Sequence, residues 1–118
     1  MSAYEFTDEQ YVAATERGRI HALVKPTAKS ARYDRAARKC IIELRNGSTF
    51  IFCPRQLQGM EHATDEQLAQ VEIAGGTGLH WDELDGDFTV EGLVNGRFGT
   101  RRYMHERFGW PLEIPLEL

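Results

Sequence analysis

The 118-residue chain has the length of one domain, and its 42% hydrophobic and 27% charged residues are ordinary for a globular protein that buries a single core. Two cysteines provide no disulfide framework, and no apolar run approaches the roughly 20 residues that a membrane-spanning helix needs. The acidic N-terminus lacks the basic and then apolar pattern of a secretion signal, so we expect a cytoplasmic protein without a membrane partner.

The net charge of −4 is distributed in blocks along the chain. Residues 17–55 hold ten Lys and Arg against two acidic residues, whereas residues 56–91 hold nine acidic residues and no Lys or Arg. Such charge asymmetry indicates either that oppositely charged faces of the protein bind each other or that the protein binds a charged partner. Folding that interleaves the two blocks on one mixed surface is the simpler alternative.

The first part of the chain predicts a helix and a linker. Thr7 and Gln10 match a capping box at the start of a helix over residues 7–17. We therefore expect an N-terminal helix and linker over residues 1–27. The rest of the chain, residues 28–118, is expected to form one α+β domain with an extended C-terminal tail.

The clearest structural prediction is a three-stranded antiparallel meander. Strands are expected over residues 28–34, 39–44 and 48–53, and the last two are rich in Ile, Phe and Thr. Asn46 and Gly47 lie between them and predict a two-residue type I′ turn, because both residues tolerate positive φ.

A two-residue turn would place Cys40 opposite Cys53 at a non-hydrogen-bonded pair, with Cα atoms about 4.5 Å apart. We expect these thiols to face each other, reduced in the cytoplasm but able to form a strained disulfide on oxidation. The two cysteines also alternate with Ile42, Leu44 and Ile51 on one predicted face. This alternation indicates core residues rather than nucleophiles.

Short elements are predicted after the meander. Helical pieces are expected over residues 54–60 and 64–70, the second with a capping box of Thr64 and Gln67. Strand pieces should flank the glycine turn at residues 75–78.

Two further helices and a tail complete the chain. Thr89 and Thr100 are expected to cap helices over residues 90–96 and 101–108. The tail, residues 110–118, alternates apolar residues with Pro and Glu and so predicts an extended strip with one apolar side. We expect this strip to pack on its own sheet, with a homodimer through the tail as the alternative.

A cluster of carboxylates is the main candidate site. The carboxylates are not spaced along the sequence as the ligands of a calcium loop are. The four histidines are too scattered for a zinc site. Asp85 is expected to close a turn, and Asp87 to cap the next helix together with Thr89. We expect no catalytic residue, no cofactor and no metal. The predicted partner-binding residues are Asp82, Glu83, Asp85, Asp87 and Glu91.

Two other motifs bear on nucleotide and nucleic-acid binding. The glycine turn is followed by Leu79 and His80 rather than by the Lys-Ser/Thr pair of a P-loop. Residues 97–110 interleave Arg with Phe and Tyr, as in proteins that stack on bases. The aromatic spacing equally fits an apolar helix face, and the acidic net charge makes a nucleic-acid partner unlikely.

Several short motifs occur in an order that resembles one bacterial family. They are Ala63–Glu66 at a helix start, the Gly-rich stretch Ile73–Trp81, and Leu84–Leu93 with its L-D-x-D pattern. Over about residues 31–104 the chain resembles the domain-of-unknown-function family 2442. The resemblance implies a small α+β domain without enzymatic activity, often encoded beside a small basic protein in a toxin–antitoxin-like pair.

These observations predict an α+β fold in which an antiparallel sheet, led by the meander, carries short helices on one face. As function we expect a non-catalytic, antitoxin-like protein-binding module whose acidic segment binds a basic protein partner. The main alternative is a phage-type inhibitor that blocks a nucleic-acid-handling complex by acidic mimicry. A DNA-binding regulator and a hydrolase that uses the carboxylate cluster are less favoured.

Overall fold

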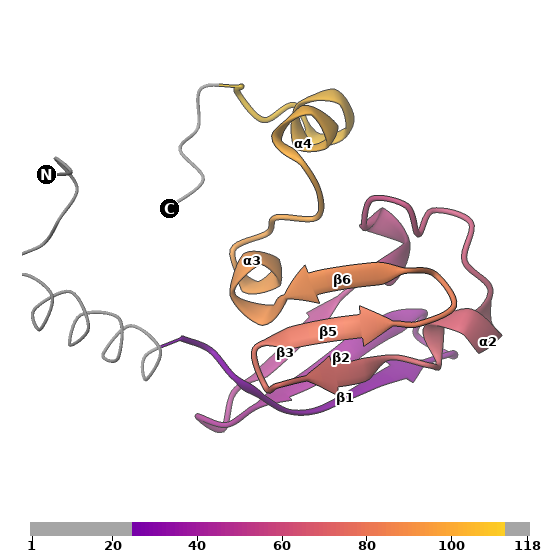
Figure 1. Ribbon diagram of the computed structural model, residues 1–118, viewed down its shortest axis with the longest axis vertical. Helices are drawn as coiled ribbons and strands as arrows, with labels where there is room; N and C mark the ends of the chain where they lie inside the picture. The colour runs from indigo at the N-terminus through magenta and orange to yellow at the C-terminus, as the bar shows by residue number, and fades with distance from the viewer. Residues whose placement is uncertain (1–24, 113–118) are drawn as a thin grey trace, which may run out of the picture.

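The computed structural model describes residues 25–112 (Figure 1). In chain order the elements are β1 (Ala28–Asp34), β2 (Lys39–Leu44), β3 (Thr49–Phe52), the 3-10 helix η1 (Pro54–Gln56), α2 (Asp65–Leu68), β4 (Glu72–Ala74), β5 (Gly78–Trp81), β6 (Gly86–Thr89), α3 (Val90–Val94) and α4 (Arg101–Phe108). The helix predicted over residues 7–17 and the tail beyond Leu112 lie outside the described residues and stay predictions. Within residues 25–112, no helix combines the length and the hydrophobicity that crossing a membrane requires.

β1, β2 and β3 form an antiparallel sheet in that order, which confirms the predicted meander. Burial alternates along β2, where Cys40, Ile42 and Leu44 are buried and Lys39 is exposed. Because successive side chains of a strand point to opposite faces, these three residues make one face of the sheet apolar.

The turn between β2 and β3 differs from the prediction. The N–H of Leu44 donates to Ser48 O at 2.8 Å, and the N–H of Gly47 donates to Leu44 O at 3.1 Å, so three residues form the loop instead of two. Gly47 has a φ of 91°, whereas Asn46 keeps a negative φ and accepts the N–H of Ser48 on its side chain at 2.9 Å. The loop is therefore a type I turn followed by a glycine bulge, the common three-residue alternative.

The longer loop shifts the register by one residue, and the predicted cysteine pair is wrong. Cys40 lies opposite Phe52, and Ile41 lies opposite Ile51. Cys53 follows the end of β3, and both cysteines are free thiols. Burial raises the pKa of the Cys40 thiol to about 12, with a smaller contribution from the neighbouring Cys53. This thiol is a core group, as the alternation along β2 indicated.

A second antiparallel sheet has the order β4–β5–β6. The strand pieces predicted on both sides of the glycine turn are β4 and β5, but the sequence did not predict β6. On β5, Leu79 and Trp81 are buried, and His80 between them lies on the opposite face. The indole N–H of Trp81 donates to Leu68 O at 3.1 Å, so the buried polar atom of this large side chain has a partner.

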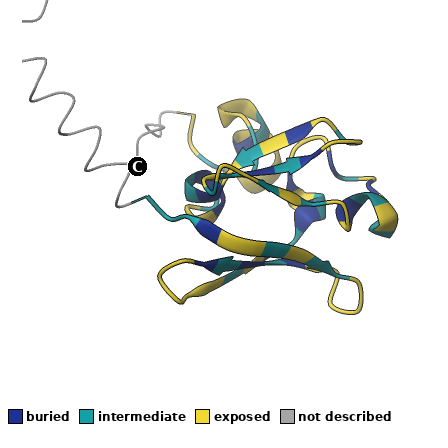
Figure 2. Ribbon diagram, turned by 60° about the horizontal axis from the view of Figure 1, so that its bottom comes forward, coloured by how far each residue is buried: buried dark blue, intermediate teal, exposed yellow. Residues whose placement is uncertain are grey.

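The two sheets face each other across one hydrophobic core (Figure 2). They are joined at one edge, where the N–H of Ala28 donates to Gly76 O at 2.7 Å. The predicted α+β class is confirmed, with a second sheet that the sequence did not reveal. The largest fully buried side chains include Trp81, Ile42, Leu57, Met60, Leu68, Leu79 and Leu93.

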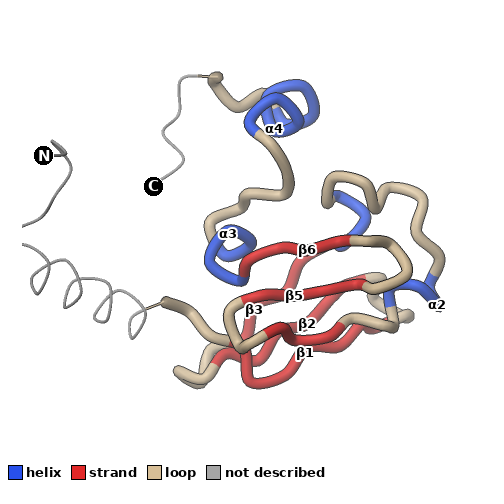
Figure 3. Tube along the Cα trace, in the orientation of Figure 1, coloured by secondary structure: helices blue, strands red, loops and turns tan. Residues whose placement is uncertain are grey.

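The short helices (Figure 3) begin at the predicted capping residues. The hydroxyl of Thr64 accepts the N–H of Gln67 at 3.1 Å, and the side chain of Gln67 accepts the N–H of Thr64 at 2.9 Å, which confirms the capping box of α2. Thr89 and Thr100 cap α3 and α4, and Gly109, with a φ of 74°, ends α4.

Candidate functional site: an acidic sheet surface

The two charge blocks of the sequence lie on different sheets. Residues 28–45, which form β1, β2 and their turns, hold six Lys and Arg against two carboxylates. Residues 72–91, which form the second sheet and the start of α3, hold six carboxylates and no Lys or Arg. We call these six residues the acidic surface. They are Glu72, Asp82, Glu83, Asp85, Asp87 and Glu91.

Folding keeps these two blocks apart on the sheets, and ion pairs join them near α2 and at α3. Arg35 lies 3.4 Å from Glu66, and both side chains are largely exposed. Arg55 lies 3.0 Å from Asp65. Neither of these two pairs uses a member of the acidic surface, whose Glu91 instead lies 4.0 Å from Lys25.

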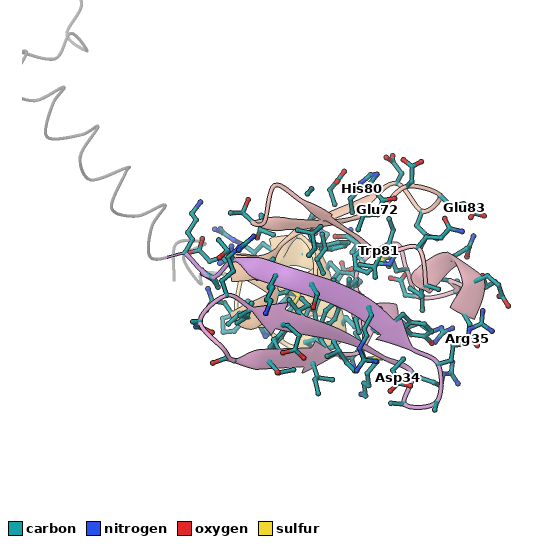
Figure 4. All side chains as sticks on the ribbon, turned by 90° about the horizontal axis from the view of Figure 1, so that it is seen from below. Asp34, Arg35, Glu72, His80, Trp81 and Glu83 are labelled. Carbon is teal, nitrogen blue, oxygen red and sulfur yellow. The ribbon has the colours of Figure 1, made fainter. Side chains whose placement is uncertain are left out.

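Three titratable side chains form a cross-strand row on the second sheet. Glu72 lies opposite His80, and His80 lies opposite Asp87. Figure 4 shows Glu72 and His80 on the outer side of this sheet, whereas Trp81 is directed into the core between the layers. Cβ atoms of directly opposed residues are about 4.5–5.5 Å apart, so Glu72 and Asp87 flank His80 on this face.

His80 is held between two carboxylates. Its Nδ1 lies 2.7 Å from Asp87 Oδ1, and its Nε2 lies 3.1 Å from Asp82 Oδ1. Because ionised carboxylates only accept hydrogen bonds, both ring nitrogens must donate, which requires the imidazolium form. The pKa of His80 is raised by the hydrogen bond to Asp82 first and by the one to Asp87 second. Both ring nitrogens of His80 thus contact carboxylates in this structure.

The loop between β5 and β6 carries the other predicted carboxylates. Asp85 closes this turn as predicted: its N–H donates to Asp82 O at 3.2 Å, and its φ of 50° is left-handed, a conformation that Asp tolerates well. The capping role predicted for Asp87 is wrong. Asp87 lies within β6, where strand alternation directs it to His80, and the side-chain cap of α3 is Thr89.

The five predicted site residues are thus not all in one place. Asp82 and Asp87 meet at His80, and their side chains are 89% and 74% exposed. Glu83 turns to the segment just after α2, where Gln70 Nε2 donates to it at 2.9 Å. Glu91 lies on α3, 4.0 Å from Lys25.

An open groove of about 480 Å³ lies beside the acidic surface. It is formed by β6 with the turn before it, by the loop after η1, and by the segment that leads into α4. Two predicted carboxylates are therefore reachable within a concave part of the surface. The polar lining residues are Gln58, Asp85, Asp87, Thr89, Arg97 and Thr100.

The chemistry that this arrangement supports is attraction of cations. Among residues 25–112, no group of three or more His, Cys, Asp or Glu side chains is placed to hold a metal ion. Exposed carboxylates gathered on the second sheet and its β5–β6 loop create a negative potential that raises the local concentration of positively charged groups.

Sequence reasoning missed a polar network around Arg55. Its Nη1 donates to Tyr33 Oη and its Nη2 to Asp65 Oδ1, both at 3.0 Å, and its Nε donates to Ala63 O at 3.0 Å. Tyr33 Oη in turn donates to Asp65 Oδ1 at 2.7 Å. The hydrogen bonds from Tyr33 and Arg55 lower the pKa of Asp65. No local pattern announces this network, because its members come from β1, η1 and the start of α2.

The Arg- and aromatic-rich segment forms α4 and its approach. The rings of Phe98 and Tyr103 pack edge-on against Phe108, with centroids 5.9 Å and 6.1 Å away. Arg107 lies over the Tyr103 and Phe108 rings. These aromatic side chains pack against one another, as the helical spacing predicted.

Comparison with known proteins adds the family to this geometry. The sequence profile of a family described as "Protein of unknown function (DUF2442)" matches residues 28–99. That range covers both sheets and α3. No curated protein matches the chain.

Two solved structures are similar to this fold. A crystal structure of a protein of unknown function from Rhodospirillum rubrum has a TM-score of 0.65 and 52% sequence identity, over 68% of this chain and 98% of that one. The solution NMR structure of an uncharacterized protein from Chromobacterium violaceum has a TM-score of 0.65 and 28% identity, over 97% of this chain and 100% of that one.

Proposed function

The chain belongs to the DUF2442 family, and from that premise and its charge layout we propose that it is a non-catalytic, antitoxin-like module that binds a basic protein partner. The observation that carries the proposal is the second sheet, where residues 72–91 hold six carboxylates and no Lys or Arg. The partner contributes Lys and Arg side chains to this acidic surface.

The exposure of the acidic surface supports this function. The side chains of Asp82 and Asp87 are 89% and 74% exposed. Cations from the solvent can therefore contact them, and the Lys and Arg side chains of a partner would displace these cations. Opposite charges accelerate association more than they increase affinity, and salt screens them over about 8 Å at physiological ionic strength. Binding should therefore weaken as salt is added, mainly through a slower association rate.

The state of His80 supports a binding role over a catalytic one. A general base needs a free nitrogen or carboxylate within reach of a substrate proton. Here both ring nitrogens of His80 are engaged by Asp82 and Asp87. The cation in turn reduces the mutual repulsion of the two carboxylates, which keeps them close together at the surface.

The experiment co-expresses this chain with the product of each neighbouring gene and looks for a small basic protein that copurifies with it. We expect a complex whose Kd rises with salt. The variant Asp82→Asn/Asp87→Asn should weaken binding by about tenfold, which corresponds to about 1.4 kcal/mol. The matched control is Glu43→Gln/Glu106→Gln, which removes the same charge outside the acidic surface and should leave the Kd unchanged.

A growth assay tests the antitoxin character. Expression of the basic protein alone should slow growth, and co-expression of this chain should restore it, less so for Asp82→Asn/Asp87→Asn. Equal loss of affinity in the test and control variants would assign binding to net charge and contradict a defined surface. The absence of any complex at low salt would contradict the function itself.

A further inference from the structure

β3 is an open edge of the first sheet. In the order β1–β2–β3 it has a neighbour on one side only, and no residue in the described part of the chain forms a backbone hydrogen bond with its other side. Proteins commonly protect such edges with charged side chains, because unpaired N–H and C=O groups are a template for another strand. β3 carries no charge over Thr49–Phe52, whereas β1, β4 and β6 carry Lys29, Glu72 and Asp87.

The register of the β2–β3 hairpin shows which backbone groups are available. The bond from Leu44 N–H to Ser48 O makes the closing pair hydrogen-bonded, and such pairs alternate along an antiparallel ladder. Ile42 with Phe50 is therefore hydrogen-bonded, and Ile41 with Ile51 is not. The N–H and C=O groups of Ile51 thus point away from β2, toward the open edge.

The side chains at this edge are apolar and exposed. Ile51 is 55% exposed, the highest value among the large hydrophobic residues between 25 and 112. It ends a cross-strand row on the outer face of the sheet, in which Arg32 lies opposite Ile41 and Ile41 lies opposite Ile51. A strand added beside β3 would extend this row and cover Ile51 from the side.

We propose that β3 pairs antiparallel with β3 of a second copy of this chain, around a two-fold axis at Ile51, to form a continuous six-stranded sheet. A second copy fits because the strand is uncharged, so two copies meet there without repulsion. Stacking of two acidic surfaces, or of two β1–β2 faces with their six Lys and Arg, would bring charges of the same sign together. The two-fold arrangement uses the same strand on both copies and closes as a dimer.

The geometry sets further pairs. Ile51 of each copy exchanges both backbone hydrogen bonds with Ile51 of the other, and Thr49 lies opposite Cys53 of the other copy. Cys53 has the extended conformation that this pairing needs, with φ of −90° and ψ of 109°. Four-residue edges bury little area, so the dimer belongs to the weak class, and its population depends on concentration.

Sedimentation velocity of the full chain, over a wide range of protein concentration, tests the association. We expect the average mass to rise toward twice the monomer value. Ile51→Lys should remain monomeric at every concentration with an unchanged Tm, because Ile51 is an exposed edge residue. The matched control is Ile41→Lys, which places the same charge on the same face but on the central strand, and which should still dimerise.

A cross-link tests the register. In the variant Ile51→Cys/Cys53→Ser, the two introduced thiols lie at a hydrogen-bonded pair with Cα atoms about 5.5 Å apart, within disulfide range. Mild oxidation should give a covalent dimer, and Thr49→Cys/Cys53→Ser should give much less. A wild type that stays monomeric overturns the proposal, as does a dimer that survives Ile51→Lys. Equal loss of the dimer in Ile41→Lys would assign the contact to the sheet face and overturn edge pairing.

Discussion

His80 is the residue whose surroundings most constrain its chemical state. Two carboxylate oxygens, from Asp82 and Asp87, lie within hydrogen-bond distance of its two ring nitrogens. Neutral imidazole has one donor and one acceptor nitrogen, so only the cation satisfies both contacts. The raised pKa of His80 therefore makes the net charge of the acidic surface depend on pH.

We predict that Asp82→Asn/Asp87→Asn lowers the pKa of His80, because both hydrogen bonds that favour the imidazolium are weakened. NMR titration of the His80 ring protons measures this pKa. The control variant Glu43→Gln should leave the pKa of His80 unchanged. A pKa unchanged by the double variant would show that the ring is not held by these carboxylates.

The stability linked to His80 has a defined sign. Its pKa is raised in the folded state, so the stabilisation is complete below the unfolded value of about 6.5 and is lost as pH rises through the folded pKa. The difference in free energy of unfolding between wild type and His80→Gln should therefore be larger in mild acid than in alkali. Denaturant titrations at several pH values measure it, and a difference that grows toward alkali would contradict the imidazolium.

The β2–β3 hairpin is the element in which a one-residue difference matters most. Its glycine bulge moves Cys40 from opposite Cys53 to opposite Phe52. The same shift places Ile51 opposite Ile41, on the outer face, instead of opposite the buried Ile42. The loop type therefore determines both the separation of the two thiols and the exposure of Ile51.

Gly47→Ala should destabilise the protein by about 1 kcal/mol, because a φ of 91° is unfavourable for any residue with a Cβ atom. No atom lies within 4 Å of the added carbon, so the cost comes from the backbone conformation and not from a clash. Urea denaturation measures the change. Ser48→Ala, the neighbouring control, should be close to neutral, and equal effects of the two substitutions would argue against the glycine bulge.

On the scale of the whole molecule, the Arg55 network connects elements that the chain places far apart. Tyr33 comes from β1, and Asp65 begins α2. The guanidinium has three hydrogen bonds to fixed partners, and the side chain is only 18% exposed. A planar fork of donors is needed to reach all of them, and Lys cannot replace it.

Arg55→Lys should therefore lower the free energy of unfolding by about 1–2 kcal/mol. The matched control is Arg35→Lys, whose pair with Glu66 is 3.4 Å long between side chains that are 57% and 71% exposed. That substitution should cost less than about 0.5 kcal/mol, because exposed ion pairs contribute little. Equal effects in thermal or urea unfolding would show that the Arg55 contacts are no stronger than a surface pair.

The sequence determined the features that depend on residues close together in the chain. The caps at Thr64, Thr89 and Thr100 follow from hydrogen bonds to residues three positions later, and the strands of the meander follow from alternating apolar residues. The turn at Asp85 has the same local origin. Such contacts form wherever the segment folds, so a pattern in the sequence is sufficient to predict them.

Only the tertiary structure decided the contacts between segments. A three-residue loop and a two-residue loop are both compatible with Asn46-Gly47, and the core face of Cys40 and Phe52 favours one register over the other. The carboxylates of the candidate site were predicted from composition, but the contact of Asp87 with His80 depends on the pairing of β5 with β6. The Arg55 network likewise exists only after β1 and α2 are packed together, because hydrogen bonds over such sequence separations leave no periodic pattern in the chain.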